Sequence, residues 1–140
     1  MKSDECMSEV SITNTFNSDS KAGLIVDRSY SFSLRIVNLC KELQEDKIGR
    51  ILMNQLIRSG TSIGANVEEA QGSPSKKDFA YKMSIALKEC RETLYWLRII
   101  RDCEIFSTNR LSDIIDECSQ IRNILTSILI TTNRSLQIKR

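Results

Sequence analysis

The sequence predicts an all-α protein, an antiparallel up-and-down four-helix bundle, and three observations support this. The chain of 140 residues is long enough for one domain with a real core. It contains one proline and five glycines, and such scarcity of helix-breaking residues favours long helices over a turn-rich β fold. From Ser29 onward, apolar residues recur at spacings of three and four in four segments joined by short links, as in amphipathic helices that bury one face.

The two ends of the chain are predicted to lie outside the bundle domain, which spans residues 28–134. Residues 1–27 are rich in Ser, Thr, Asn and Asp without a clear period, which is typical of a flexible tail. A short strand or docking segment at Val10–Phe16 or Leu24–Val26 is the alternative. Residues 135–140 are predicted to be a basic C-terminal tail.

The first two helices are predicted at Ser29–Glu45 and from Lys47 to a break at Gly72-Ser73-Pro74, where a glycine and a proline punctuate the chain. Each carries one apolar stripe. The stripe of the first helix consists of Phe32, Ile36, Leu39, Cys40 and Leu43. The stripe of the second consists of Leu52, Leu56, Gly60, Ile63, Val67 and Ala70.

The third helix is predicted to begin after Ser75, which with Asp78 resembles a capping box, and the fourth to begin near Ser107 or Thr108. Both have more apolar residues than one buried stripe requires, which predicts that bundles associate with one another. In the third helix the stripe is Phe79, Met83, Ala86, Cys90, Leu94 and Leu97, widened by Ile85, Leu87, Trp96 and Ile100. In the fourth the stripe is Leu111, Ile114, Cys118, Ile121, Leu125, Ile128 and Thr132, with Ile115, Ile124, Leu129 and Ile130 outside it.

The chemistry of the side chains argues against an enzyme. The chain has no histidine, which excludes Ser-His-Asp and Cys-His catalysis and the common histidine-containing zinc sites. Its five cysteines include no CxxC pair, so we expect reduced thiols packed as small hydrophobes, with a disulfide framework or a zinc site as the alternative. An acidic cluster at Asp113, Asp116 and Glu117 is expected to be a solvated face rather than a cation site. No cofactor is expected.

The charge and hydropathy of the chain limit where the protein is expected to be located and what it is expected to bind. Neither a signal peptide nor an apolar run of about 18 residues occurs, so a cytoplasmic protein is expected. Residues 1–27 contain two basic and five acidic side chains, whereas residues 28–140 contain 18 and 13. The folded part is therefore mildly basic, which permits contact with nucleic acid without requiring it.

The stretch RSGTSIGANVEEAQG, residues 58–72, has two glycines close together but is not predicted to be a phosphate-binding loop. Neither Walker-type nor dinucleotide-binding spacing is present, and no strand precedes it. The apolar stripe instead continues through Gly60 without losing phase. Because each glycine costs about 1 kcal/mol against alanine inside a helix, Gly60 and Gly64 are expected to mark close packing against another helix or subunit.

A polar stripe follows the same helix at Gln55, Arg58, Ser62, Asn66 and Glu69. It is either a solvated face or a polar seam, in which Arg58 and Glu69 pair with neighbouring helices and Asn66 sets their register. Glu89 and Glu92 are candidate partners of Arg58. The predicted seam, between helices or subunits, consists of Arg58, Gly60, Ser62, Gly64, Asn66, Glu69, Glu92 and Trp96.

The third helix also carries basic and aromatic residues at alternating spacings of four and three, opposite its apolar stripe. Basic groups there could neutralise phosphates, and tyrosines could stack on unpaired bases; a solvated face with snorkelling side chains is the alternative. We call these residues, with Ser84 between them, the basic face: Lys77, Tyr81, Lys88, Arg91, Tyr95 and Arg98.

Two blocks of sequence resemble a known family. The run from Gln55 to Ala70, together with Ser75–Lys76, Asp78–Phe79, Lys82, Ile85–Glu89, Glu92–Thr93 and Tyr95–Leu97, closely resembles the signature of the bacterial four-helix-bundle family of 23S rRNA intervening-sequence proteins. The resemblance covers about residues 28–130. It implies a short antiparallel bundle that assembles into a ring-shaped homo-oligomer, typically a pentamer, without enzymatic activity.

Similar bundles serve as accessory subunits of reverse transcriptases in diversity-generating retroelements, where basic surfaces meet nucleic acid. The resemblance therefore implies a non-enzymatic protein that binds RNA or DNA, with a reverse transcriptase as one expected protein partner. An oligomeric adaptor that docks a protein partner without binding nucleic acid is the alternative. A metal-dependent nuclease using Asp113 and Asp116 is a third and much weaker hypothesis.

Overall fold

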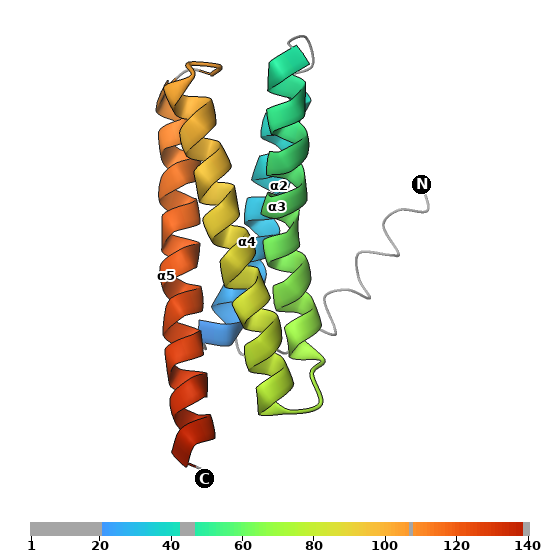
Figure 1. Ribbon diagram of the computed structural model, residues 1–140, viewed down its shortest axis with the longest axis vertical. Helices are drawn as coiled ribbons and strands as arrows, with labels where there is room; N and C mark the ends of the chain where they lie inside the picture. Colours follow the sequence, from blue (N-terminus) through green and yellow to red (C-terminus); the bar gives the residue numbers. More distant parts are fainter. Residues whose placement is uncertain (1–20, 43–46, 107, 139–140) are drawn as a thin grey trace, which may run out of the picture.

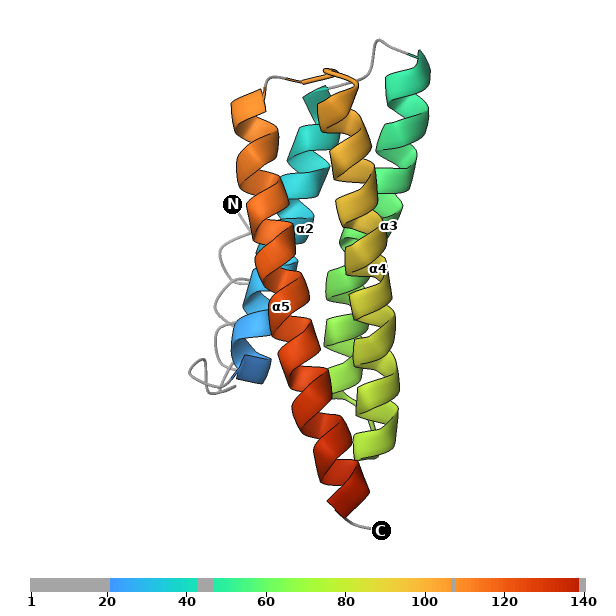
Figure 2. The same cartoon turned by 60° about the vertical axis from the view of Figure 1, so that its left-hand side comes forward.

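The computed structural model describes residues 21–42, 47–106 and 108–138. They form four helices: α2 (Lys21–Glu42), α3 (Lys47–Gln71), α4 (Lys76–Asp102) and α5 (Thr108–Ile138). The helices run alternately up and down (Figure 1). Each packs against its neighbours along the chain, and α2 also packs against α5, which closes the bundle (Figure 2). The prediction of an antiparallel up-and-down four-helix bundle is confirmed.

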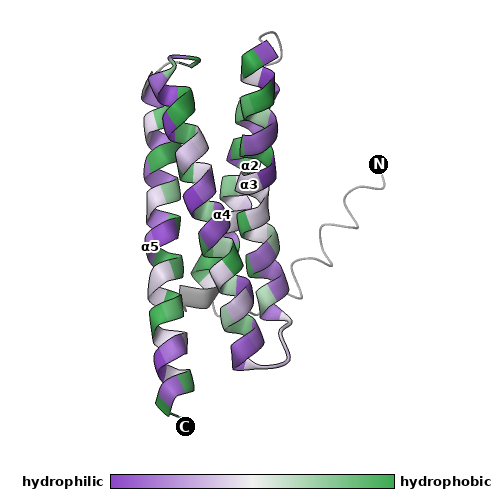
Figure 3. Cartoon of the chain, in the orientation of Figure 1, coloured by the Kyte–Doolittle hydropathy of each residue, from purple (hydrophilic) through white to green (hydrophobic). Residues whose placement is uncertain are grey.

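The core lies along the bundle axis and is built from the predicted stripes. Hydrophobic and hydrophilic residues alternate around each helix (Figure 3), as expected where one face of a helix is buried. The largest side chains that are fully buried come from all four helices. They are Phe32, Ile25, Ile36, Leu39, Leu56, Ile63, Met83, Leu97, Ile100, Leu111, Ile121 and Leu125.

The first helix is longer at its start than predicted. It begins at Lys21 rather than Ser29, so residues 21–27 belong to the bundle and Leu24–Val26 is helical. Ile25 is fully buried and lies seven residues before Phe32, so it extends the apolar stripe by about two turns. Ser29 is also fully buried and donates a hydrogen bond to the carbonyl of Val26 at 3.2 Å. Because this polar residue lies on the buried face, it interrupts the apolar pattern, and the prediction began the helix there. Val10–Phe16 and Leu43–Glu45 lie outside the described residues.

The last helix also extends further than predicted. Residues 135–138 continue α5 instead of forming a tail. Lys76, in the first turn of α4, donates a hydrogen bond from Nζ to Oγ of Ser135 at 2.7 Å. This contact joins the end of α5 to the start of α4, beyond Ile128, the last apolar residue of the stripe on α5.

Ser75 caps α4 as predicted. Its backbone is extended, with φ −143° and ψ 161°, and its hydroxyl accepts a hydrogen bond from the backbone N–H of Asp78 at 3.1 Å. The Asp78 carboxylate accepts from the Ser75 hydroxyl at 2.7 Å, rather than reaching the backbone N–H of the cap as in a full capping box. No helix in the described part of the chain is long and apolar enough to cross a membrane.

Candidate functional site

Gly60 and Gly64 of α3 mark close packing, as predicted, and the element they approach is α2 of the same chain. A Cβ placed on Gly60 would lie 3.0 Å from Cγ2 of Ile36, and one on Gly64 would lie 3.2 Å from the carbonyl oxygen of Ser29 and from Oγ of Ser33. These separations are shorter than ordinary contacts of a methyl group. The absence of side chains at Gly60 and Gly64 therefore lets α2 and α3 approach closely.

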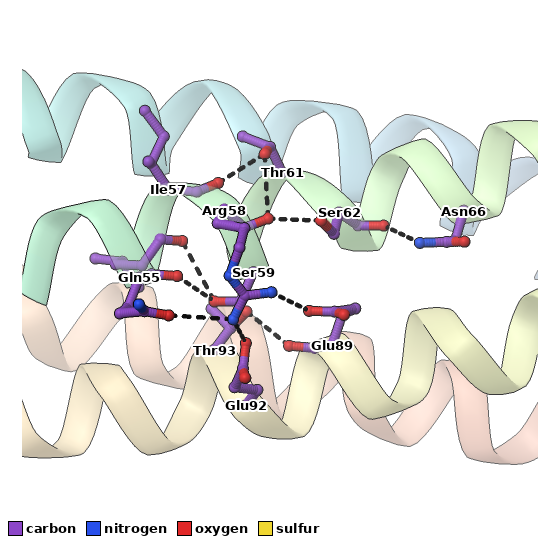
Figure 4. A network of polar contacts seen from close by, with 11 residues as sticks. Gln55, Ile57, Arg58, Ser59, Thr61, Ser62, Asn66, Glu89, Glu92 and Thr93 are labelled. Atoms are coloured by element: carbon purple, nitrogen blue, oxygen red, sulfur yellow. Dashed lines mark hydrogen bonds and ion pairs between the residues drawn. The ribbon is translucent and has the colours of Figure 1, made fainter.

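The charged residues of the predicted seam join α3 to α4 (Figure 4). The Arg58 guanidinium donates hydrogen bonds to the carboxylate of Glu92, to that of Glu89 at 3.4 Å, and to Oε1 of Gln55 at 3.3 Å. Farther along the same pair of helices, Nζ of Lys82 donates to the Glu69 carboxylate at 2.7 Å. This bond raises the pKa of Lys82. The prediction that Arg58 and Glu69 pair with a neighbouring helix is confirmed.

Ser62 and Asn66 form hydrogen bonds within α3 rather than to a neighbouring helix, so the predicted role of Asn66 in setting register is not seen. The Ser62 hydroxyl donates to the carbonyl of Arg58 at 2.6 Å, and the Asn66 amide donates to the carbonyl of Ser62 at 2.8 Å. Both bonds run back to the preceding turn of α3 (Figure 4), since short polar side chains reach their own backbone more easily than another helix. The hydrogen bonds of Asn66 therefore do not set the register between helices.

The sequence reading missed two buried hydroxyl residues of the α3–α4 interface, Ser59 and Thr93, both shown in Figure 4. Their hydroxyls donate to the carbonyls of Gln55 at 3.0 Å and Glu89 at 2.8 Å. Each polar group is thereby satisfied within its own helix, and the residue remains small enough for a close contact. The available signal was their spacing, since Ser59 lies three residues after Leu56 and Thr93 lies three after Cys90.

The basic face forms as predicted along the outside of α4, and every one of its six residues is exposed. Tyr81 and Tyr95 are 65% and 55% exposed. Within residues 21–42, 47–106 and 108–138, its four cations form no ion pair; they are Lys77, Lys88, Arg91 and Arg98. The charges of Lys77, Lys88 and Arg91 are therefore available to an anionic partner. The charge of Arg98 also acts on Asp102, whose pKa is lowered first by its hydrogen bond with Arg101 and to a smaller extent by Arg98.

The two acidic residues beside the basic face, Glu89 and Glu92, are both directed to Arg58 of α3. Arg58 offsets one of these two negative charges. The carboxylates lie on the side of α4 that faces α3, because each contacts the same guanidinium group there. They consequently oppose the cations of the basic face less than their positions in the sequence indicated.

Trp96, the last residue of the predicted seam, packs beside the basic face. Its indole is partly buried against the core, and the ring of Tyr95 meets it edge to face, with centroids 5.2 Å apart and an interplanar angle of 67°. Its Nε1 is buried and has no acceptor among the described residues. The edge-to-face contact restrains the Tyr95 ring at the end of the basic face.

The cysteines of the helices are free thiols, and the predicted packing is confirmed for those on apolar stripes. Cys90 and Cys118 are fully buried, with their Sγ atoms 3.8 Å apart across α4 and α5. The pKa of Cys118 is raised, mainly by its hydrogen bond with Cys90 and secondly by its burial. Cys40 is half-buried against the core, and burial raises its pKa to about 11. Cys103 is an exposed free thiol.

The acidic cluster at the start of α5 is divided by an ion pair. The Glu117 carboxylate accepts hydrogen bonds from Nε and Nη2 of Arg28 at 3.1 and 2.8 Å. Among the residues that the structure describes, no group of three or more acidic or cysteine side chains is arranged to hold a metal ion. Asp113 and Asp116 are exposed, as expected of a solvated face.

The surplus apolar residues lie elsewhere than predicted. Ile115, Ile124 and Leu129 are partly buried against the core of their own bundle, and Ile130 is 48% exposed. Six other large apolar side chains are exposed on α2 and α3. They are Leu24, Tyr30, Leu34, Ile48, Ile51 and Ile57.

A hollow of about 500 Å³ opens on the outside of the α2–α3 pair. Its walls are mostly apolar, with two basic side chains among them. The lining residues are Val37, Cys40, Lys41, Arg50, Met53, Asn54 and Ile57. The hollow and the exposed apolar residues leave apolar side chains of α2 and α3 accessible on the outside of the bundle.

Comparisons with known proteins agree with this geometry. Residues 21–127 match the family model described as 23S rRNA-intervening sequence protein. A crystal structure from Bacteroides thetaiotaomicron VPI-5482, described as a protein with unknown function from the S23 ribosomal protein family, is 39% identical and has a TM-score of 0.75. The match covers 79% of this chain and 98% of that one. No curated protein matches. The chain belongs to the family of 23S rRNA-intervening sequence proteins.

Proposed function

We propose that this protein is a non-enzymatic oligomeric bundle that binds RNA or DNA through the basic face of α4, as an accessory subunit of a nucleic-acid enzyme such as a reverse transcriptase. The supporting observation is that four cations and two exposed tyrosines lie along one side of α4, and that none of these cations forms an ion pair within the described residues. Lys and Arg side chains bind nucleic acid by neutralising its phosphates, and a cation without a carboxylate partner breaks no ion pair of its own protein when it does so. The family match to proteins named for intervening sequences of 23S rRNA adds support.

The experiment measures binding of mixed-sequence RNA and DNA by fluorescence anisotropy over a range of salt concentrations. Affinity is expected to fall steeply as salt rises, because each phosphate contact releases counterions. The variant Lys88→Glu, Arg91→Glu, Arg98→Glu should bind weakly. Loss of three phosphate contacts should reduce the slope of log affinity against log salt by about 2 for a single strand.

A matched control variant changes the net charge of the protein by the same amount, but at residues outside the basic face. Arg35, Lys47 and Arg134 are exposed on α2, at the start of α3 and near the end of α5, and the variant Arg35→Glu, Lys47→Glu, Arg134→Glu reverses three charges outside the basic face. It should retain most of the affinity and nearly the full salt slope. Equal loss in both triple variants would mean that only net charge matters, and it would contradict a site on α4.

The proposed assembly is a ring-shaped homo-oligomer, with a pentamer as the expected form. Its support is the number of large apolar side chains exposed on α2 and α3, since exposed apolar groups favour association between subunits. Light scattering at micromolar concentration should then give about five times the chain mass of 16.0 kDa. A monomer under these conditions would contradict the ring.

The second candidate function is an oligomeric adaptor or scaffold without direct nucleic-acid binding. The hollow of about 500 Å³ between α2 and α3 favours it, because apolar concave surfaces with a few polar groups bind partners well. This alternative predicts no anisotropy change with mixed RNA or DNA at any salt concentration. The same titration therefore separates the two functions.

A further inference from the structure

On the basic face, one tyrosine precedes and one follows the central pair of cations, Lys88 and Arg91. Tyr81 and Tyr95 are 14 residues apart, which is nearly four helical turns and about 21 Å along the axis. They consequently lie on the same side of α4. Lys88 and Arg91 stand between them on that side.

The surroundings of the two rings leave them available to a ligand. Tyr81 is 65% exposed and Tyr95 is 55% exposed, although aromatic side chains usually bury much of their area. Tyr95 is restrained by its edge-to-face contact with Trp96, and Trp96 itself packs against the core. A restrained, exposed ring can stack on a flat partner without first losing much side-chain freedom.

We infer that the basic face binds unpaired, single-stranded nucleic acid in preference to a duplex, with Tyr81 and Tyr95 stacking on bases and Lys88 and Arg91 contacting the phosphates between them. This inference rests on the proposed function. Bases in a duplex are stacked on one another, so their faces are closed to a protein side chain. In a single strand each base has a free face, and stacking on aromatic rings is tolerant of sequence.

The length of the face defines the length of strand that it accommodates. At a rise of about 3.4 Å per nucleotide, as in one strand of B-DNA, about six steps cover 21 Å. Fewer steps are needed where the bases are splayed apart. An oligonucleotide of about 12 residues therefore spans both tyrosines and falls within the site sizes of single-strand binders.

The test compares one labelled oligonucleotide of about 12 residues, as a single strand and as a blunt duplex, by fluorescence anisotropy with the full chain. The protein should bind the single strand more tightly. Tyr81→Ala and Tyr95→Ala should each weaken single-strand binding by roughly 5- to 150-fold, the effect of losing one stacked base, and should leave duplex binding unchanged. Tyr81→Phe should retain the affinity, because the ring remains.

The chain provides a control in Ile130, which is 48% exposed on α5 and lies outside both the basic face and the exposed apolar residues of α2 and α3. Ile130→Ala should change neither affinity. Far-ultraviolet circular dichroism establishes that each variant remains helical, which is expected because all three side chains are exposed. Lys88→Glu should weaken binding of the single strand and of the duplex alike.

The outcomes distinguish this inference from the proposed function. If Lys88→Glu weakens binding but the tyrosine variants do not, the nucleic-acid function stands and the stacking role is refuted. Equal binding of single strand and duplex by the unmodified protein also refutes it. Binding of neither form refutes the proposed function itself.

Discussion

Replacing Gly64 by alanine should destabilise the bundle, although alanine is the better helix former. The gain in helix propensity is about 1 kcal/mol. Against it, the new Cβ would lie 3.2 Å from the carbonyl oxygen of Ser29 and from Oγ of Ser33. The carbonyl belongs to the backbone of α2, so only movement of the whole helix relieves the contact. Overpacking of this kind costs roughly 1–3 kcal/mol, and we expect a net loss of about 1 kcal/mol.

Gly60 and Gly72 provide the comparison. At Gly60 the new Cβ would meet Cγ2, Cγ1 and Cβ of Ile36 at 3.0, 3.1 and 3.4 Å, and this β-branched side chain is fully buried and cannot turn away. Gly60→Ala should therefore also destabilise. At Gly72 the nearest atom is the Glu69 carbonyl oxygen at 3.7 Å, and no described glycine has a positive φ. Gly72→Ala should stabilise by roughly 0.4–1 kcal/mol through the unfolded chain.

The assay is urea unfolding followed by circular dichroism, at one protein concentration because the stability of an oligomer depends on it. The midpoints should rank Gly72→Ala above the unmodified protein and Gly64→Ala below it, with an unchanged slope. If Gly64→Ala were as stable as Gly72→Ala, α2 and α3 would not be in the close contact described here. The reasoning about the glycines of α3 would then be wrong.

Two further predictions concern a cap and a thiol. Ser75→Ala should lower the free energy of unfolding by about 1 kcal/mol through loss of the N-cap of α4, whereas Ser84→Ala on the exposed side of that helix should not; thermal melts of both variants check this. The pKa of Cys40 is raised by burial from an ordinary value of 9.0 to about 11, so folding favours its protonated form. The contribution of this thiol to the free energy of unfolding is fully present below pH 9 and is lost as the pH rises to about 11. Cys40→Ala should therefore make the free energy of unfolding fall less steeply over that pH range. An unchanged fall would contradict burial of the thiol.

Several features were predictable because they depend on residues a few positions apart. The period of the apolar stripes identifies the helices, and the serine before Lys76 identifies the start of α4. The pairing of Arg58 with Glu92 was also accessible, since both lie on polar stripes of consecutive antiparallel helices. The basic face followed from spacing alone, because side chains three and four positions apart share one side of a helix.

Other features depended on contacts between distant residues. Ser29 interrupted the apolar pattern, so the start of α2 became evident only when Ile25 was found buried in the core. The sequence marked Asn66 as a candidate for pairing between helices, but the structure shows its amide bonded to its own helix.

The sequence by itself determined the four helices, their polar and apolar sides and the family, because each depends on local periodicity or on a contiguous motif. Only the tertiary structure decided that Gly64 meets α2 and that Arg28 holds Glu117 across 89 residues of chain. It also decided which apolar residues stay exposed, among them six on α2 and α3. Contact between distant residues depends on how the helices rotate and pack together, and the spacing within one helix carries no information about that rotation.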